Sequence, residues 1–265
     1  MAAAAWLLGT WGDKSLLPLC GKVWKGDIKG DVQEDAKRAC AFYAIGHGDL
    51  SNKAEIAEFG GDSTMGVLLR ALVGDKSKMA DWQREAAPLK KQPDNGRAIV
   101  YNAALAILGD KAATAAATAG IKSCKAPVIR ETAKVVMVAQ TSRWAAGVRK
   151  DLAGCLGKLG DSDMEGRALA QASYALLRAG DASALPAMAK ALGSADQDVV
   201  GEAADLLSGQ WGSVGVHGHS KGLAGGVPVK GVGKLLRAAL EAHKDTSHRA
   251  NLLTAWAMQR AAGGD

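Results

Sequence analysis

The sequence predicts an all-α protein built as an α-solenoid, with about seven antiparallel helix pairs stacked in a row. Hydrophobic residues make up 48% of the 265 residues but aromatic residues only 5%, a composition typical of closely packed, alanine-rich helices. Apolar residues recur at three- and four-residue spacing along most of the chain. A Gly-Asp pair follows six of these apolar runs. Because one helix pair cannot bury its apolar face alone, such a unit must repeat.

The Gly-Asp pairs predict where helices end and begin. Glycine can adopt the left-handed conformation that ends one helix, and aspartate can cap the next, as expected at Gly180 and Asp181. Pro186 then falls in the first turn of a helix, where its missing N–H costs little. Residues 12–22 align without gaps with residues 180–190 and share Gly, Asp, Ser, Leu, Pro and Lys at matched positions. The six pairs begin at Gly12, Gly48, Gly74, Gly109, Gly160 and Gly180.

The apolar stripes between these turns define the expected helices in chain order. Helices are expected over 2–10, 14–24, 31–45, 51–59, 63–73, 76–91, 97–108, 111–119, 127–138, 144–159, 164–179, 183–192, 199–208, 232–243 and 246–262. The sixth should kink or end near Pro88. Residues 111–119 are almost all Ala and Thr, which permits very close helix approach. In the last helix, Leu252, Leu253 and Trp256 are expected to point inward.

This repeat resembles the HEAT-like repeat families, including the shorter bilin-lyase-type HEAT repeats. Their pattern is a first helix with a polar start and an Ala/Leu stripe, a Gly-Asp turn, and a second helix of the Ala-Leu-Pro-x-Leu kind. Residues 196–207 fit the usual first-helix opening, except that Gly201 stands near where many such repeats carry Arg. The resemblance covers most of residues 1–209 and implies an α-solenoid. It does not select a function, because these repeats occur in scaffolds, nucleic-acid binders and a few enzymes.

The helical pattern fails between Gly209 and Gly233, where glycine recurs and no stripe is present. We therefore expect one domain over 1–265, with 209–233 as a loop insertion before the terminal helix pair. Long loops in compact domains are usually functional or mobile. The partner-binding residues expected from this loop are Trp211, His217, His219, Lys221 and Lys230.

No catalytic, cofactor-binding or metal-binding motif is recognised. His217 and His219 can converge on an extended loop, but no nearby Asp, Glu or Cys offers a third ligand. The phosphate-binding pattern Gly-x-x-x-x-Gly-Lys-Ser/Thr is absent. The His-Glu pairs of HEAT-type hydroxylases and the motif of alkylpurine-glycosylase-like HEAT proteins are not found either. The seven tryptophans are spread evenly, without basic residues between them, which disfavours a base-stacking array.

The four cysteines leave two interpretations open. Cys20 and Cys40 fall on neighbouring helices, and Cys124 and Cys155 can be neighbours in the same way. They form either two disulfides, which would indicate a periplasmic or extracellular protein, or four small buried thiols, compatible with the cytoplasm. No window approaches 18 uncharged apolar residues, so no transmembrane segment is predicted.

The function expected from these features is a non-catalytic scaffold or adaptor that presents a concave helical surface to a protein partner within a larger assembly. The formal charge is +6, and residues 210–265 hold seven Lys/Arg against three Asp/Glu. A duplex-binding solenoid would be expected to carry a continuous basic ridge instead. The alternatives are a nucleic-acid-binding HEAT protein and a bilin-lyase-like, ligand-handling protein.

Overall fold

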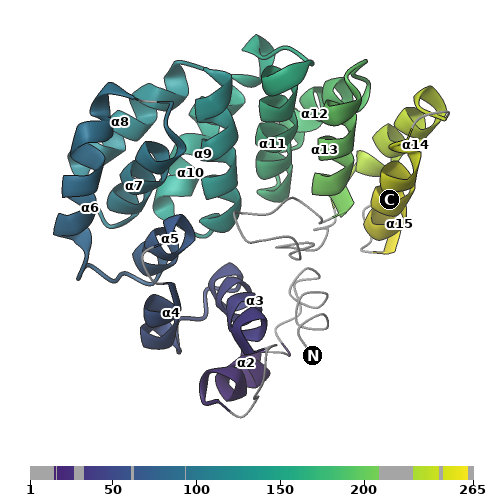
Figure 1. Cartoon of the computed structure of the whole chain (residues 1–265). Coiled ribbons are helices and arrows are strands. Elements are labelled where there is room, and N and C mark those ends of the chain that lie inside the picture. The colour runs from purple at the N-terminus through teal and green to yellow at the C-terminus, as the bar shows by residue number, and fades with distance from the viewer. Residues whose placement is uncertain are drawn as a thin grey trace.

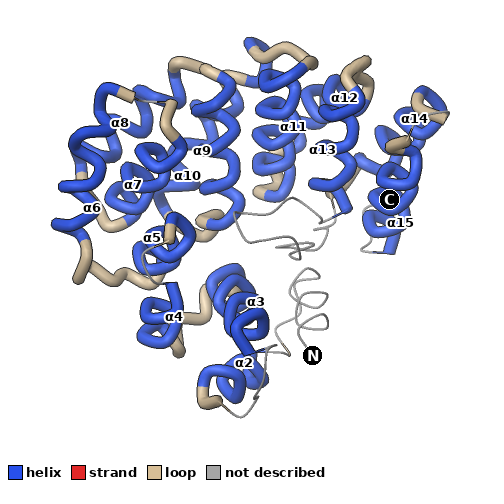
Figure 2. The backbone as a smooth tube through the Cα atoms, viewed as in Figure 1, coloured by secondary structure: helices blue, strands red, loops and turns tan. Residues whose placement is uncertain are grey.

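Every regular element in the described part of the chain is helical. The computed structural model describes residues 15, 17–26, 33–60, 63–92, 94–208, 229–244 and 247–261. These residues form 14 α-helices and three short 3-10 helices, with no strand among them (Figure 2). The all-α class is therefore confirmed. The helix expected over 2–10 and most of the 209–233 loop lie outside the described residues.

The helices follow one another through short turns, and their bounds are close to those expected. The α-helices are α2 (Leu17–Trp24), α3 (Gln33–Gly46), α4 (Lys53–Gly60), α5 (Thr64–Leu72), α6 (Met79–Ala86), α7 (Gly96–Ile107), α8 (Lys111–Lys122), α9 (Ala126–Val138), α10 (Arg143–Ala153), α11 (Asp163–Arg178), α12 (Leu185–Leu192), α13 (Gln197–Ser208), α14 (Val232–Ala242) and α15 (Arg249–Ala261). The 3-10 helices are η1 (Ala87–Lys91), η2 (Leu156–Lys158) and η3 (Ala182–Ala184). As expected, α6 ends before Pro88, and Pro127 and Pro186 lie in the first turns of α9 and α12.

From α5 onward, each odd-numbered helix packs against the next odd-numbered helix, from α5 to α15. The even-numbered helices lie against these: α6 and α8 contact α7, α10 contacts α9 and α11, α12 contacts α11 and α13, and α14 contacts α15. Figure 1 shows α6 to α15 following one another from left to right, from blue to yellow, with α5 below α7 and with α4, α3 and α2 lower still. One continuous cluster of buried side chains extends from Val67 to Ala255. The core is therefore shared between neighbouring helices along the whole row.

The glycine of the Gly-Asp pair is left-handed, as expected, at four of the six positions. The aspartate caps the following helix at Asp110 and Asp181, but the N-cap of α6 is Lys78 and not Asp75. Gly109 ends α7 in the left-handed conformation, with φ of 95°. Its N–H donates to the Ala106 carbonyl (3.0 Å), and the Asp110 N–H donates to the Leu105 carbonyl (2.9 Å), the paired bonds of a Schellman motif. The Asp110 carboxylate then accepts from the Ala113 N–H (2.9 Å) and caps α8. The other left-handed glycines of this series are Gly48, Gly74 and Gly180.

The turn at Gly160 differs from the prediction, and Gly12 lies outside the described residues. The helix expected over 144–159 ends at Ala153 and is followed by η2, so no α-helix reaches Gly160. Glycines at 154 and 157 weaken the helix there, since each costs about 1 kcal/mol relative to Ala in a helix interior. Gly160 instead donates its N–H to the Glu165 carboxylate (2.7 Å) at the start of α11.

One packing prediction was also wrong in part. Leu253 was expected inward but is 45% exposed, whereas Leu252 and Ala255 are fully buried and Trp256 is half-buried. The buried face of α15 is therefore rotated slightly from the expected one. The alanine-rich helix α8 packs against α7 and α10, yet its short side chains also leave a hollow that close approach does not fill.

Candidate functional site

The structure describes only one of the partner-binding residues expected from the sequence. Lys230 is exposed in the turn before α14, whereas Trp211, His217, His219 and Lys221 lie outside the described residues. Gln259 of α15 is completely buried and joins the end of α13 to Val229, near the end of the glycine-rich segment. Its amide accepts from the Val229 N–H (2.8 Å) and donates to the Leu207 carbonyl (2.8 Å). Gln259 was not identified from the sequence, because its partners lie about 30 and 52 positions away.

The four cysteines lie in two pairs at disulfide distance. Cys20 of α2 is joined to Cys40 of α3, and Cys124, between α8 and α9, is joined to Cys155, which follows α10. The Cα–Cα distance is 5.3 Å in both pairs, within the normal range for a disulfide. The first bridge therefore joins α2 to α3, and the second joins the ends of α8 and α10, which also contact each other.

A first set of polar side chains links α9, α11 and α13 across the odd-numbered helices. Gln171 of α11 is 4% exposed, and its amide donates to the Glu202 carboxylate of α13. Arg130 of α9 reaches past α11 to the same carboxylate, at 3.7 Å. Near the start of the same helices, Arg167 donates to Asp198 at 2.6 Å. These contacts fix side chains of three helices on one face.

The polar face continues onto α15. Asn251 donates to the Asp205 carboxylate at 3.1 Å, which joins α13 to α15. Burial raises the pKa of Asp205 above its ordinary value, the charge of His248 opposes this rise, and the neighbouring Glu202 adds to it. The ring of His248 occupies the space above Gly201, where a Cβ atom would lie 2.8 Å from it. The absence of a side chain at Gly201 therefore makes room for His248, which directly precedes α15.

The contacts of this polar face join residues far apart in the sequence, and none of them was expected from local motifs. Gln171 and Glu202 are 31 positions apart, as are Arg167 and Asp198. Both contacts join α11 to α13, and they form because these two helices pack against each other.

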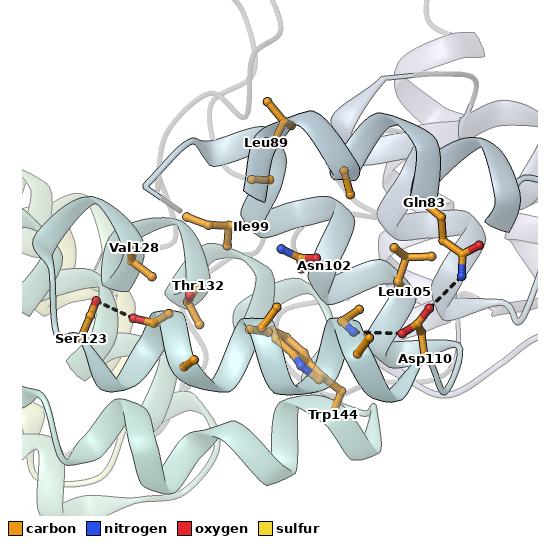
Figure 3. A pocket seen from close by; sticks show the side chains of 18 of the residues that line it. Gln83, Leu89, Ile99, Asn102, Leu105, Asp110, Ser123, Val128, Thr132 and Trp144 are labelled. Atoms are coloured by element: carbon orange, nitrogen blue, oxygen red, sulfur yellow. Dashed lines mark hydrogen bonds between the residues drawn. The ribbon is translucent and has the colours of Figure 1, made fainter. Parts of the chain in front are cut away.

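A hollow of about 790 Å³ lies among α7, α8, α9 and α10, beside the end of α6. Figure 3 shows Ile99, Leu105 and Val128 around it, with the indole of Trp144 extending from α10 into its floor. Between Ala112 and Gly120 the residues of α8 that line the hollow are all Ala or Gly, so this wall has no large side chain to fill the space.

The polar groups of the hollow divide into an interior and a rim. In the interior, Trp144 is 7% and Thr132 2% exposed. The Nε1–H of Trp144 is buried and has no hydrogen-bond partner in the described part of the chain. At the rim, Asp110 accepts from Gln83 (2.8 Å), and Lys125 pairs with Asp94 (3.6 Å). The hydrogen bond from Ala113 and then that from Gln83 lower the pKa of Asp110.

Comparison with protein-family models, with curated proteins and with solved structures found no match to this chain. Among the described residues, no group of three or more His, Cys, Asp or Glu side chains is placed to hold a metal ion. None of the described helices has both the length and the apolar character needed to cross a bilayer.

Proposed function

We propose that this protein is a HEAT-like α-solenoid that works as a non-catalytic scaffold or adaptor and binds another protein along the polar face of α9, α11, α13 and α15. The observation that carries the proposal is the set of side-chain bonds across these helices, from Arg130, Gln171 and Glu202 to Asp205 and Asn251. Side chains already held in place lose less conformational entropy when a partner binds. The consecutive packing of the odd-numbered helices supports the solenoid part of the proposal.

The charges of this face favour a protein partner over a nucleic acid. Helix α13 places Asp198, Glu202 and Asp205 on it, next to Arg130 and Arg167. Carboxylates repel a phosphate backbone, whereas mixed charges and amides match the polar groups of a protein surface. Nucleic-acid binding is therefore the alternative, and the crosslinking experiment below distinguishes it from protein binding.

Site-specific photo-crosslinking tests the proposal in cells that produce the protein. A photoreactive amino acid replaces Asp198, whose side chain is 68% exposed on the proposed face. The control replaces Ala115, an exposed residue of α8 outside that face. We expect a discrete protein adduct from position 198 and none from position 115. No protein adduct at position 198, or the same adducts at both positions, would refute the proposed surface, and an adduct with nucleic acid would support the alternative.

A further inference from the structure

The hollow beside α8 has the size and lining of a small-molecule site. Ligand sites commonly have volumes of about 300–1,000 Å³ and mostly apolar walls with a few polar groups, and the hollow measures about 790 Å³. Its lining combines the alanines of α8 with larger apolar side chains, including Leu89, Ile99, Leu105 and Val128. Burying the apolar surface of a ligand against these walls would be favourable.

The indole of Trp144 adds a specific requirement. Its N–H can only donate a hydrogen bond, and a buried donor without a partner costs about 1–3 kcal/mol. The indole is more than nine-tenths buried, lines the hollow and has no acceptor for Nε1–H among the described residues. Figure 3 places it at the floor, below Asn102 and Leu105. An oxygen acceptor on a bound molecule would satisfy this donor.

The charged residues that line the hollow are already paired, so they do not favour a charged ligand. Asp110 lies at the rim and is held by the Ala113 N–H and the Gln83 amide. Lys125, also at the rim, is paired with Asp94. The interior polar side chains are neutral, and an unpaired charge buried among them would carry a large desolvation penalty.

We propose that the hollow binds an uncharged, mainly apolar small molecule with a carbonyl-type oxygen, which accepts a hydrogen bond from Trp144. This binding goes beyond the proposed protein partner: the hollow and the polar face share only α9, and there the hollow is lined by Val128 and Thr132 whereas the polar face uses Arg130.

Binding of Nile red, an uncharged apolar dye with a ring carbonyl, tests the site through the change in dye fluorescence. Ala116 lines the hollow and is exposed to it, so Ala116→Phe should fill the space without a backbone clash. The control is Ala115→Phe, the same substitution on an exposed position of the same helix that does not line the hollow. We expect one saturable site whose affinity falls by about tenfold or more in Ala116→Phe and stays within about twofold in Ala115→Phe. Equal binding by the wild type and Ala116→Phe, or equal loss in both variants, would overturn the proposal.

Two further variants test the filling of the hollow at a second position and the hydrogen bond from Trp144. If Ala116→Phe loses its helical circular dichroism, Ala112→Phe replaces it, because Ala112 also lines the hollow and is exposed. Trp144→Phe keeps an aromatic ring but removes the N–H, and should weaken dye binding about fivefold. Its control is Trp256→Phe, a half-buried tryptophan stacked with Arg260 outside the hollow. Unchanged affinity in Trp144→Phe would refute the hydrogen bond to the ligand.

Discussion

The close packing of α11 against its neighbours is tested by Gly166→Ala. A Cβ atom at this position would lie 2.6 Å from Cγ2 of Val199 in α13 and 2.7 Å from the carbonyl carbon of Asp161. The first contact is with a fully buried, β-branched side chain, which has few rotamers available. The second involves backbone, so either α11 or the turn before it must move. We therefore expect the substitution to destabilise the protein, although alanine is normally the better residue in a helix.

The magnitude follows from comparison with Gly147→Ala. Gly147 lies inside α10 and is exposed, and a Cβ atom added there would have no neighbouring atom within 4 Å. Alanine at this position should therefore stabilise the protein by about 0.5–1 kcal/mol. The same gain in helix propensity applies at Gly166, but overpacking costs about 1–3 kcal/mol. In the difference between the free energies of unfolding of the two variants, the gain in helix propensity cancels. What remains is the steric cost at Gly166, about 1–3 kcal/mol.

Urea unfolding of the wild type and both variants measures this difference. Far-UV circular dichroism and tryptophan fluorescence should give coincident transitions if unfolding is two-state. With a slope of about 3 kcal/mol/M, the midpoints of the two variants should differ by about 0.3–1 M, with Gly166→Ala lower. A midpoint for Gly166→Ala at or above that of Gly147→Ala would show that α11 is not held this close to α13. It would also remove the support for a rigid polar face.

Two other predictions concern α13 and the second disulfide. Burial raises the pKa of Asp205 in the folded state, so the protein loses stability as the pH rises through that pKa. Asp205→Asn removes the charge, and its amide oxygen can still accept the hydrogen bond from Asn251. The substitution should therefore increase the urea midpoint at neutral pH. The gain should shrink as pH falls toward the ordinary aspartate pKa, and an equal gain at all pH values would contradict the role of the charge. The bridge between Cys124 and Cys155 closes a separation of 31 residues, so replacing both by Ser should cost about 3–4 kcal/mol. An unchanged urea midpoint in non-reducing buffer would show that the bridge does not stabilise the fold.

The class of fold and most of the helix ends could be predicted without coordinates. A left-handed glycine followed by a capping aspartate acts within a few residues, so Gly109-Asp110 could be recognised without knowing its surroundings. The same is true of Pro127, whose place in a first helical turn depends on its own geometry. Gly160 was misassigned because the helix before it had already ended at Ala153. A local motif predicts a turn, but the preceding residues decide which element that turn ends.

Which side chains meet depends on how the helices pack, and this could not be predicted. The rotation of each helix about its axis set the exposure of Leu253 and brought Gln171 to Glu202 across 31 positions. It also turned the alanines of α8 toward an open space, with the Trp144 N–H buried in its floor. Helix propensity and capping are fixed by neighbours along the chain, whereas packing depends on the shapes of surfaces that come together only when neighbouring helices pack in the folded protein.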